Sequence, residues 1–294
     1  SLAFFLKCLS LESKIKVFYF HVDHGLRKNS NKEAKQLFNI LNKVGIKIEI
    51  LKWEGSKPSS NIQKIARDNR YGLFFNKMSK YNIKYLLVAH HKNDLLENFL
   101  IRLIRGSGLE GLTSFNSQHI IYKDKNILRP LLQFNKKDLE YVSKRVFKLF
   151  IDDKSNYENK FQRSRIRVIL RELEKEGLNI SKMNLTIKNL SLSNSSINYI
   201  VRNNLEINCH INYKKNTAIF NENFLKQPDE IVFRSISIIL NKISNRYYPS
   251  RGKKIIRLIR QIKQPNFKKT TLAKCLIEKY SNTYKIMEEN VKKN

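Results

Sequence analysis

The pattern of hydrophobic positions in the first part of the chain alternates between helical and extended periods. Residues 2–9, LAFFLKCL, form a compact apolar run typical of a core helix, and residues 16–22, KVFYFHV, have the β-branched and aromatic content of a buried strand. The sequence SNKE at 30–33 is a capping box that predicts the start of a helix, with Gly45 at its end.

The same alternation continues to residue 106. Residues 46–53 and 84–89 are predicted strands, and a helix capped by one of two serines at 59–60 is expected to run to about Lys80. A further helix over 93–105 ends at a glycine. Strands that alternate with helices predict an α/β fold, a Rossmann-like parallel sheet with flanking helices, in which ligands bind at the carboxyl ends of the strands.

The pattern becomes weaker after residue 110. Residues 117–132 are compatible with a hairpin, and helices are expected over 136–150 and from 163 onward. From about residue 178 the chain has the pattern of helices with polar joints, and 270–289 is predicted to form a terminal hairpin. We therefore predict two parts: a catalytic domain over 1–177 and a mainly helical C-terminal region over 178–294.

The composition adds a strong basic bias. The chain has 57 Lys and Arg against 25 Asp and Glu, a net charge of +32 and a pI of about 10.1, which favours a polyanionic partner such as nucleic acid. Codon bias in an AT-rich genome is an alternative source of the lysines. The three cysteines lack metal-site spacing and are expected to be buried thiols in a reducing compartment. No apolar run is long enough for a membrane span, so no membrane partner is expected.

Two polar clusters follow predicted strands. His90, His91, Asp94 and Glu97 come directly after the strand over 84–89, and carboxylates three apart on a helix share a face that can hold Mg²⁺ or an ammonium group. The sequence HVDHGLR at 21–27 ends another strand. The alternative interpretation is a capped helix with solvated acids in the first case, and a polar loop in the second.

Three other segments are candidates for phosphate contacts. The glycine-rich sequence RGSGLEGL at 105–112 lets a phosphate approach the backbone, although it is not a Walker A sequence and a helix C-cap is the alternative. Arg163 and Arg167 are four residues apart on one helical face. A basic face is also expected on a later helix, at Lys253, Lys254, Arg257 and Arg260, next to an apolar stripe of Ile256 and Ile259; solvated basic surface is the alternative for both.

Taken in order, these segments resemble one family. HVDHGLR, the AR..RY of IARDNRY, AHHKNDLLE, RGSGLEGL, RPLL, and DKSN followed by RSRIR are similar to the bacterial tRNA(Ile)-lysidine synthetases of the PP-loop, or N-type ATP pyrophosphatase, superfamily. The likeness covers roughly residues 1–170 and extends more weakly into the C-terminal region. The order and spacing of six blocks make it specific.

The resemblance implies an activity and its ligands. ATP would adenylate C2 of the wobble cytidine, position 34, in the CAU anticodon of tRNA(Ile), and L-lysine would displace AMP. The product, lysidine, changes codon reading from AUG to AUA. ATP, Mg²⁺, L-lysine and tRNA are the implied ligands, and a cytoplasmic or organellar location follows. A homodimer is left open.

The resemblance also implies roles for particular residues. The catalytic residues would be Asp94, His90, Glu97 and Arg163, with Asp94 also a candidate Mg²⁺ contact. The ATP-binding residues would be Ser1, Asp23, His24 and Arg105. Contacts to tRNA or phosphate would come from Arg70 and Arg167, and from the basic face Lys253, Lys254, Arg257 and Arg260 of the C-terminal region.

Two departures from the family pattern bear on these expectations. The SGGxDS loop is absent, so we expect Ser1 to be the last residue of a truncated loop. In addition, the family's HHxDDQxET reads HHKNDLLEN, with Asn93 and Asn98 in place of an acid and a threonine. The alternative functions are another PP-loop tRNA-modifying enzyme, such as a thiolase, and a non-catalytic RNA-binding fragment.

Overall fold

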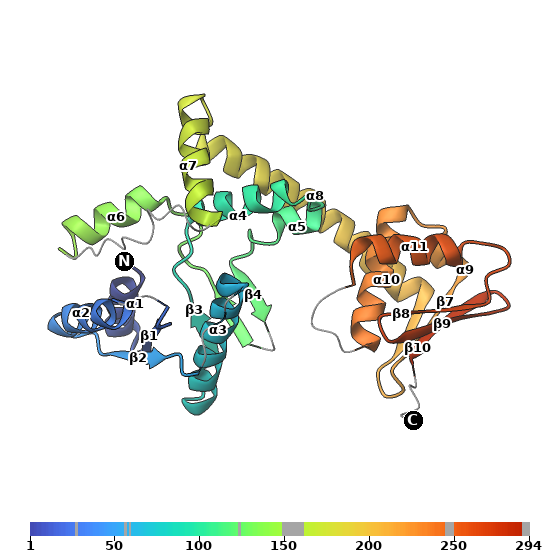
Figure 1. The fold of residues 1–294 in the computed structure, drawn as a ribbon, viewed down its shortest axis with the longest axis horizontal. Helices are drawn as coiled ribbons and strands as arrows, with labels where there is room; N and C mark the ends of the chain where they lie inside the picture. The colour runs from blue at the N-terminus through green and yellow to red at the C-terminus, as the bar shows by residue number, and fades with distance from the viewer. Residues whose placement is uncertain are drawn as a thin grey trace. The chain divides into compact units, whose positions relative to one another are not determined.

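The computed structural model describes residues 1–26, 29–55, 58, 60–122, 125–148, 162–244 and 250–289. The chain divides into two compact units, Ser1–Leu190 and Ser191–Asn294, which are described separately below (Figure 1). The predicted domain boundary at 177 and 178 stays a prediction. Arg27 of the HVDHGLR segment, the loop over 151–161 and part of the predicted hairpin turn lie outside the described residues.

The first unit contains helices and strands in alternating order, as predicted. Its elements are α1 (Leu2–Ser13), β1 (Tyr19–Asp23), α2 (Ser30–Lys43), β2 (Ile48–Lys52), α3 (Ile62–Lys80), β3 (Tyr85–Leu87), α4 (Lys92–Ile104), α5 (Leu109–Thr113), β4 (His119–Tyr122), β5 (Lys125–Leu128), α6 (Lys136–Arg145) and α7 (Gln162–Lys175). The long helix α8 (Ile180–Asn208) begins in this unit and continues into the second.

The described strands of the first unit form two small sheets. β1 pairs with β2 in parallel, with Tyr19 opposite Ile48, and β3 pairs with β5 in parallel, with Leu86 opposite Ile127. β4 is antiparallel to β5, which confirms the predicted hairpin and places its second strand in a parallel pair with β3. The α/β class is confirmed, but β1 and β3 are not paired with each other.

Several helix ends differ from the sequence prediction. The predicted capping box at 30–33 is not formed: α2 begins at Ser30 itself, behind Asn29, and no side-chain hydrogen bond caps it. Helix α6 ends at Arg145, earlier than expected. The predicted stops at Gly45 and Gly106 are confirmed, since both adopt the left-handed conformation, with φ of 71° and 67°.

The core of the first unit supports the start of α4. Leu95, Leu96 and Phe99 on α4 are buried against Phe115 and against Ile166 of α7. Burial of an apolar side chain stabilises the fold by roughly 1.5–3 kcal/mol. This packing fixes α4 and α7 relative to each other and therefore fixes the polar residues that precede α4.

The second unit is built on an antiparallel sheet in the order β6-β7-β10-β9-β8. Its elements are β6 (Cys209–Asn212), β7 (Thr217–Asn221), α9 (Glu222–Leu225), α10 (Asp229–Ile243), α11 (Gly252–Ile262), β8 (Lys269–Leu272), β9 (Cys275–Tyr280) and β10 (Thr283–Glu288). The terminal hairpin is confirmed as β9 and β10. Alternate residues of β7 and β10, such as Phe220 and Tyr284, face the buried side, where α10 and α11 contribute Ile236 and Leu258.

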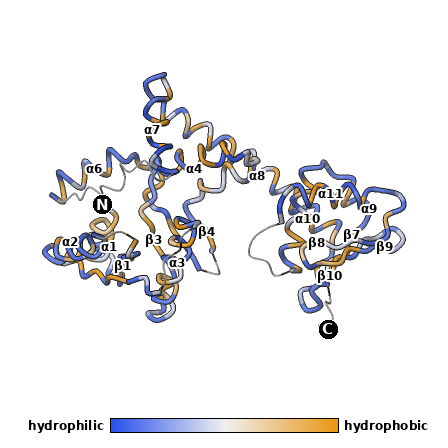
Figure 2. Tube along the Cα trace, in the orientation of Figure 1, coloured by the Kyte–Doolittle hydropathy of each residue, from blue (hydrophilic) through white to orange (hydrophobic). Residues whose placement is uncertain are grey.

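Helix α11 shows why this unit has a basic surface. Figure 2 shows hydrophobic and hydrophilic residues alternating along α11. Ile255, Leu258, Ile259 and Ile262 are buried, and Lys253, Lys254, Arg257 and Arg260 are exposed. The apolar stripe differs from the prediction at Ile256, which is 44% exposed.

Candidate active site

Polar residues follow the carboxyl ends of strands in the first unit. Of the residues predicted from sequence, Asp23 is the last residue of β1 and His90 lies three residues after β3. Arg129, which was not predicted, directly follows β5. The carboxyl ends of parallel strands are the expected place for a ligand in an open α/β fold.

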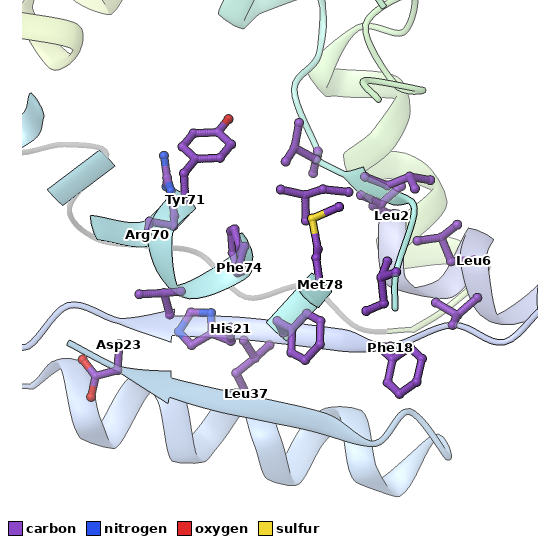
Figure 3. Close-up of a pocket in the computed structure, with 18 of the residues that line it drawn as sticks. Leu2, Leu6, Phe18, His21, Asp23, Leu37, Arg70, Tyr71, Phe74 and Met78 are labelled. Atoms are coloured by element: carbon purple, nitrogen blue, oxygen red, sulfur yellow. The ribbon is translucent and has the colours of Figure 1, made fainter. Parts of the chain in front are cut away.

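A large, partly open pocket of about 1720 Å³ lies between β1, β3 and the helices beside them. One end is polar and includes Asp23 and Arg70, and His24 and His90 also line the pocket. The other end is apolar: Figure 3 shows Leu2 and Leu6 of α1, Phe18 and Met78 around it, with Arg70 and Asp23 at the opposite end. The polar end is therefore the candidate site for substrates.

Asp23 and His24 are held by a tight turn at the end of β1. The Asp23 carboxylate accepts a hydrogen bond from the backbone N–H of Gly25 at 3.0 Å, and Gly25 has a φ of 60°. The His24 ring meets the Trp53 ring edge to face, with centroids 6.0 Å apart. An acceptor beside two aromatic rings fits a nucleoside, and the ATP-binding role of these two residues stays a prediction.

His90 is buried in a cationic environment. Burial is the largest cause that lowers the pKa of His90 to about 4; Asp94 raises it, and Arg129, Arg67 and Arg163 lower it further. The imidazole Nδ1 is buried and has no hydrogen-bond partner among the described residues. His90 is therefore neutral at physiological pH, with a ring nitrogen that is available for a proton.

Asp94 lies in the first turn of α4 and caps this helix. Its carboxylate accepts a hydrogen bond from the backbone N–H of His91 at 3.0 Å, and the His91 side chain completes a capping box at the start of α4. The helix dipole also favours a carboxylate in this first turn. The neighbouring Asn93, which replaces a family acid, accepts a hydrogen bond from the backbone N–H of Lys136 at the start of α6.

Glu97 lies one turn further along α4 and forms an ion pair. Its side chain is 3% exposed, and its two carboxylate oxygens accept hydrogen bonds from the Nε and Nη2 of Arg167 at 2.5 and 3.3 Å. A bidentate pair of this kind fixes both side chains. Glu97 and Arg167 thus join α4 to α7. From the sequence, Glu97 was predicted to be catalytic and Arg167 to contact tRNA or phosphate.

Arginines from three elements meet near His90. Burial is the largest cause that lowers the pKa of Arg70, and the positive charges of Arg67 and Arg163 lower it further, as neighbouring cations do. Arg67 lies over the Tyr71 ring at 5.0 Å. Excess positive charge at a ligand edge suits the oxygens of a polyphosphate. Sequence reasoning named Arg70 and Arg163 but missed Arg67 and Arg129, although both stand in the family segments AR..RY and RPLL.

One predicted ATP-binding residue is not brought to this cluster. Arg105 is at the C-terminal end of α4, about 20 Å along the helix from its start. It donates a hydrogen bond to the Oε1 of Gln162 at 2.6 Å, and so contacts the beginning of α7. The basic residues of α11 belong to the second unit.

The sequence of this chain matches a known protein family. The sequence model described as the PP-loop domain matches residues 1–173, more than half of the chain. The chain belongs to the PP-loop family. This PP-loop chain is 31% identical over 271 residues to the tRNA(Ile)-lysidine synthase of Wolbachia pipientis wMel, and 30% identical over 302 residues to that of Rickettsia prowazekii (strain Madrid E).

The matches extend over nearly all of this PP-loop chain. The Wolbachia match covers 92% of it and 63% of the relative, and the Rickettsia match covers 100% and 67%. The resemblance predicted from sequence is therefore confirmed. The chain spans about two thirds of the length of these relatives.

A solved structure shares the PP-loop fold. The U34-tRNA thiolase NcsA from Methanococcus maripaludis with its [4Fe-4S] cluster superposes with a TM-score of 0.50 and 14% sequence identity. The superposition covers 64% of this chain and 67% of that one. At this identity the likeness concerns the fold alone, and it confirms the α/β architecture.

Proposed function

We propose that this protein ligates L-lysine to C2 of the wobble cytidine, position 34, in the CAU anticodon of tRNA(Ile), using ATP. The product is lysidine, with release of AMP and pyrophosphate, and codon reading changes from AUG to AUA. The observation that carries the proposal is the match, over 92% and 100% of the chain, to relatives named tRNA(Ile)-lysidine synthase.

The reaction makes two chemical demands on the site. In the first step the C2 oxygen of cytidine attacks the α-phosphate of ATP, and pyrophosphate leaves. In the second step the side-chain amine of lysine attacks C2, the C–O bond breaks, AMP leaves with that oxygen, and the amine loses a proton. Cations are needed where pyrophosphate leaves, and an anion or neutral base is needed where the ammonium binds.

Arg70 and His90 of the pocket, together with the charged residues that act on them, suit these demands. Arg67, Arg70 and Arg163 supply the positive charge for phosphate oxygens, and the neutral imidazole of His90 supplies a proton acceptor beside them. Asp94 is the nearby carboxylate for the lysine ammonium. Asp23 and His24 would hold the nucleoside of ATP, and Ser1 its phosphates. Glu97 would act through Arg167, which positions α7 and with it Arg163.

Mg²⁺ is implied by the use of ATP. The part of the chain that the structure describes holds no group of three His, Cys, Asp or Glu side chains suited to a metal ion. The residues present fit an ion bound mainly by phosphate oxygens, with Asp94 as its protein ligand, in the way that Mg²⁺ is often bound with nucleotides.

RNA binding is assigned to the basic faces of both units. The chain carries a net charge of +32, and the exposed face of α11 presents Lys253, Lys254, Arg257 and Arg260.

No described helix is long and apolar enough to cross a membrane. We place the reaction in the cytoplasm, or in an organelle matrix.

The deciding experiment is mass spectrometry of the tRNA(Ile) anticodon after incubation of the full-length protein with ATP and lysine. A gain of one lysine residue at the wobble cytidine supports the proposal. Sulfur incorporation instead would favour a thiolase, and tRNA binding without any modification would favour a non-catalytic RNA-binding protein. Cysteine placement favours the ligase, since Cys8, Cys209 and Cys275 lie on three separate elements.

A further inference from the structure

A buried arginine at the end of β5 has no part in the reaction described so far. Arg129 is 3% exposed, and no described carboxylate forms an ion pair with it. Its Nη1 donates hydrogen bonds to the backbone carbonyls of Phe115 at 3.0 Å and Ser117 at 3.3 Å, while its Nε is buried without a partner among the described residues. A buried charge held only by neutral acceptors is unfavourable unless the arrangement serves another purpose.

Arg129 is held both at its backbone and at its guanidinium. Its own backbone N–H donates to the carbonyl of Gln118 at 2.7 Å, and its carbonyl accepts from the N–H of Leu132 at 3.2 Å. At the other end the guanidinium lies 4.1 Å from the centroid of the Phe115 ring, a short cation–π distance. Arg129 therefore ties the segment after α5 to the end of β5.

Phe115 connects this arginine to the candidate site. Its ring is 6% exposed and meets the imidazole of His90 nearly at right angles, with centroids 5.0 Å apart. The Nδ1 of His90 makes no hydrogen bond with the described residues, and His90 lies between β3 and α4, outside both elements. The orientation of this imidazole thus depends on packing rather than on a hydrogen bond at Nδ1.

We propose that Arg129 is a positioning residue for His90. Its guanidinium holds the Phe115 ring in place by stacking and by the two carbonyl contacts, and that ring holds the imidazole toward the polar end of the pocket. The inference rests on the proposed function only in assuming that His90 serves the lysine ligation; the contacts themselves do not depend on it.

The charges around His90 agree with this arrangement. Four charged groups from the surrounding elements act on its pKa: Asp94 of α4, Arg129 after β5, Arg67 of α3 and Arg163 of α7. Burial has the largest effect, and the three arginines also disfavour the imidazolium. Arg129 therefore orients the ring and also helps to keep it neutral.

The position of His90 can be measured without any substrate. An aromatic ring at 5.0 Å shifts the carbon-bound protons of the imidazole, and NMR of the full chain above pH 7 reports this shift. The His90 signals are assigned by their loss in His90→Gln. Phe115→Leu defines the shift expected when the ring is lost, and Phe115→Tyr, which keeps the ring, should stay near the wild-type value.

Arg129→Met keeps an unbranched apolar stem but removes the guanidinium, with its charge and its N–H donors, and it should move the His90 signals to the value of Phe115→Leu. Arg129→Lys keeps the charge without the planar stack and should do the same; it also remains informative if the methionine variant folds poorly. The exposed Arg145→Met is the matched control and should match the wild type. Wild-type His90 shifts in both Arg129 variants would overturn the inference.

Single-turnover lysine ligation gives the second readout. Arg129→Met and Arg129→Lys should slow ligation at least tenfold, while Phe115→Tyr stays within about threefold of the wild type, which is under 1 kcal/mol. If the His90 signals move in the Arg129 variants but the ligation rate stays at the wild-type value, the role of Arg129 as a positioning residue is also overturned. A wild-type protein that does not ligate lysine would contradict the proposed function and would leave the NMR comparison to decide the contact.

Discussion

Asp94 combines a structural and a proposed chemical role in one carboxylate. It caps α4 by accepting a hydrogen bond from the backbone N–H of His91, and its charge raises the pKa of His90. Asp94→Asn retains a side-chain oxygen that can accept the hydrogen bond from the backbone N–H of His91. We expect nearly complete loss of lysidine formation with an intact fold, measured by single-turnover lysine incorporation and circular dichroism. A rate within about threefold of the wild type, under 1 kcal/mol, would rule out this role.

His90 should make stability depend on pH over a defined window. Its pKa is about 4 in the folded chain and about 6.5 when unfolded, so the unfolded chain binds the extra proton between these values. The contribution of neutral His90 to the free energy of unfolding is fully present above pH 6.5 and is lost as the pH falls to 4. Its size is on the order of 3 kcal/mol. Urea unfolding from pH 4 to 7 should show a flatter profile for His90→Gln.

The exposed His210→Gln is the matched control for this measurement. It removes a histidine from the surface strand β6 of the second unit and should keep the wild-type pH profile. Equal profiles for His90→Gln and the wild type would show that the imidazole is not held neutral in the folded chain.

At the scale of elements, α4 and α7 depend on the pair formed by Glu97 and Arg167. Arg167→Met leaves a carboxylate that is 3% exposed without its partner, and we expect a loss of about 3 kcal/mol in the free energy of unfolding. Replacing both residues by Met should recover much of that loss, since the apolar pair leaves no buried charge. Chemical denaturation of the single and double variants measures both effects.

The exposed pair of Lys175 and Glu172 on α7 provides the comparison. Both side chains are more than half exposed, so Lys175→Met should change stability by less than about 1 kcal/mol. If the double Met variant were no more stable than Arg167→Met, the pair would not explain how α7 is held.

How far the sequence predicts the fold depends on how local each element is. Helices α3, α4 and α7 follow from periodicity because each buries residues at helical spacing. Strands β1 and β2 follow from residue content and alternation. Strands β6 and β7 were not predicted: they are four and five residues long, and β7 pairs with β10, more than 60 residues later. Such pairing is set by the tertiary structure, which a local window cannot contain.

The candidate site was predictable in the same limited sense. Asp23, His24, His90 and Asp94 were found because polar residues directly after apolar strands are unusual. The ion pair of Glu97 was not, since its partner lies 70 residues away. Arg129 stands in the RPLL block, but its contact with Phe115 was not predictable, because Phe115 lies 14 residues earlier, between α5 and β4.

The basic face of α11 leads to a prediction about RNA binding. Replacing Lys253, Lys254, Arg257 and Arg260 by Gln should weaken tRNA binding and reduce its salt dependence, because each lost phosphate contact removes about 0.9 from the log–log slope. ATP binding should not change. Filter binding of tRNA across a salt series provides the slope.

The second unit offers a control with the same change in net charge. Lys214, Lys215, Lys268 and Lys274 are exposed on its turns, and replacing them by Gln should leave the slope near that of the wild type. A quadruple α11 variant with the wild-type slope would mean that this face is only solvated.

At the scale of the whole molecule, the two units differ in how they are stabilised. The second unit has one continuous sheet with helices on one side, and its buried residues form a single cluster. The first unit divides its strands between two sheets, and its buried residues separate into smaller clusters. We expect the second unit to be protected longer in hydrogen exchange, since protection follows the density of buried contacts.

The two sheets of the first unit leave β1 and β3 each with one edge that has no strand partner among the described residues. Such edges are templates for intermolecular pairing, so this chain should form concentration-dependent oligomers in sedimentation velocity. A charged side chain on an edge strand opposes that pairing. Phe20→Lys on β1 should therefore keep the chain monomeric, whereas Leu185→Lys on the exposed surface of α8 should not. Colloidal behaviour, rather than melting temperature, would then limit how this protein can be stored and handled.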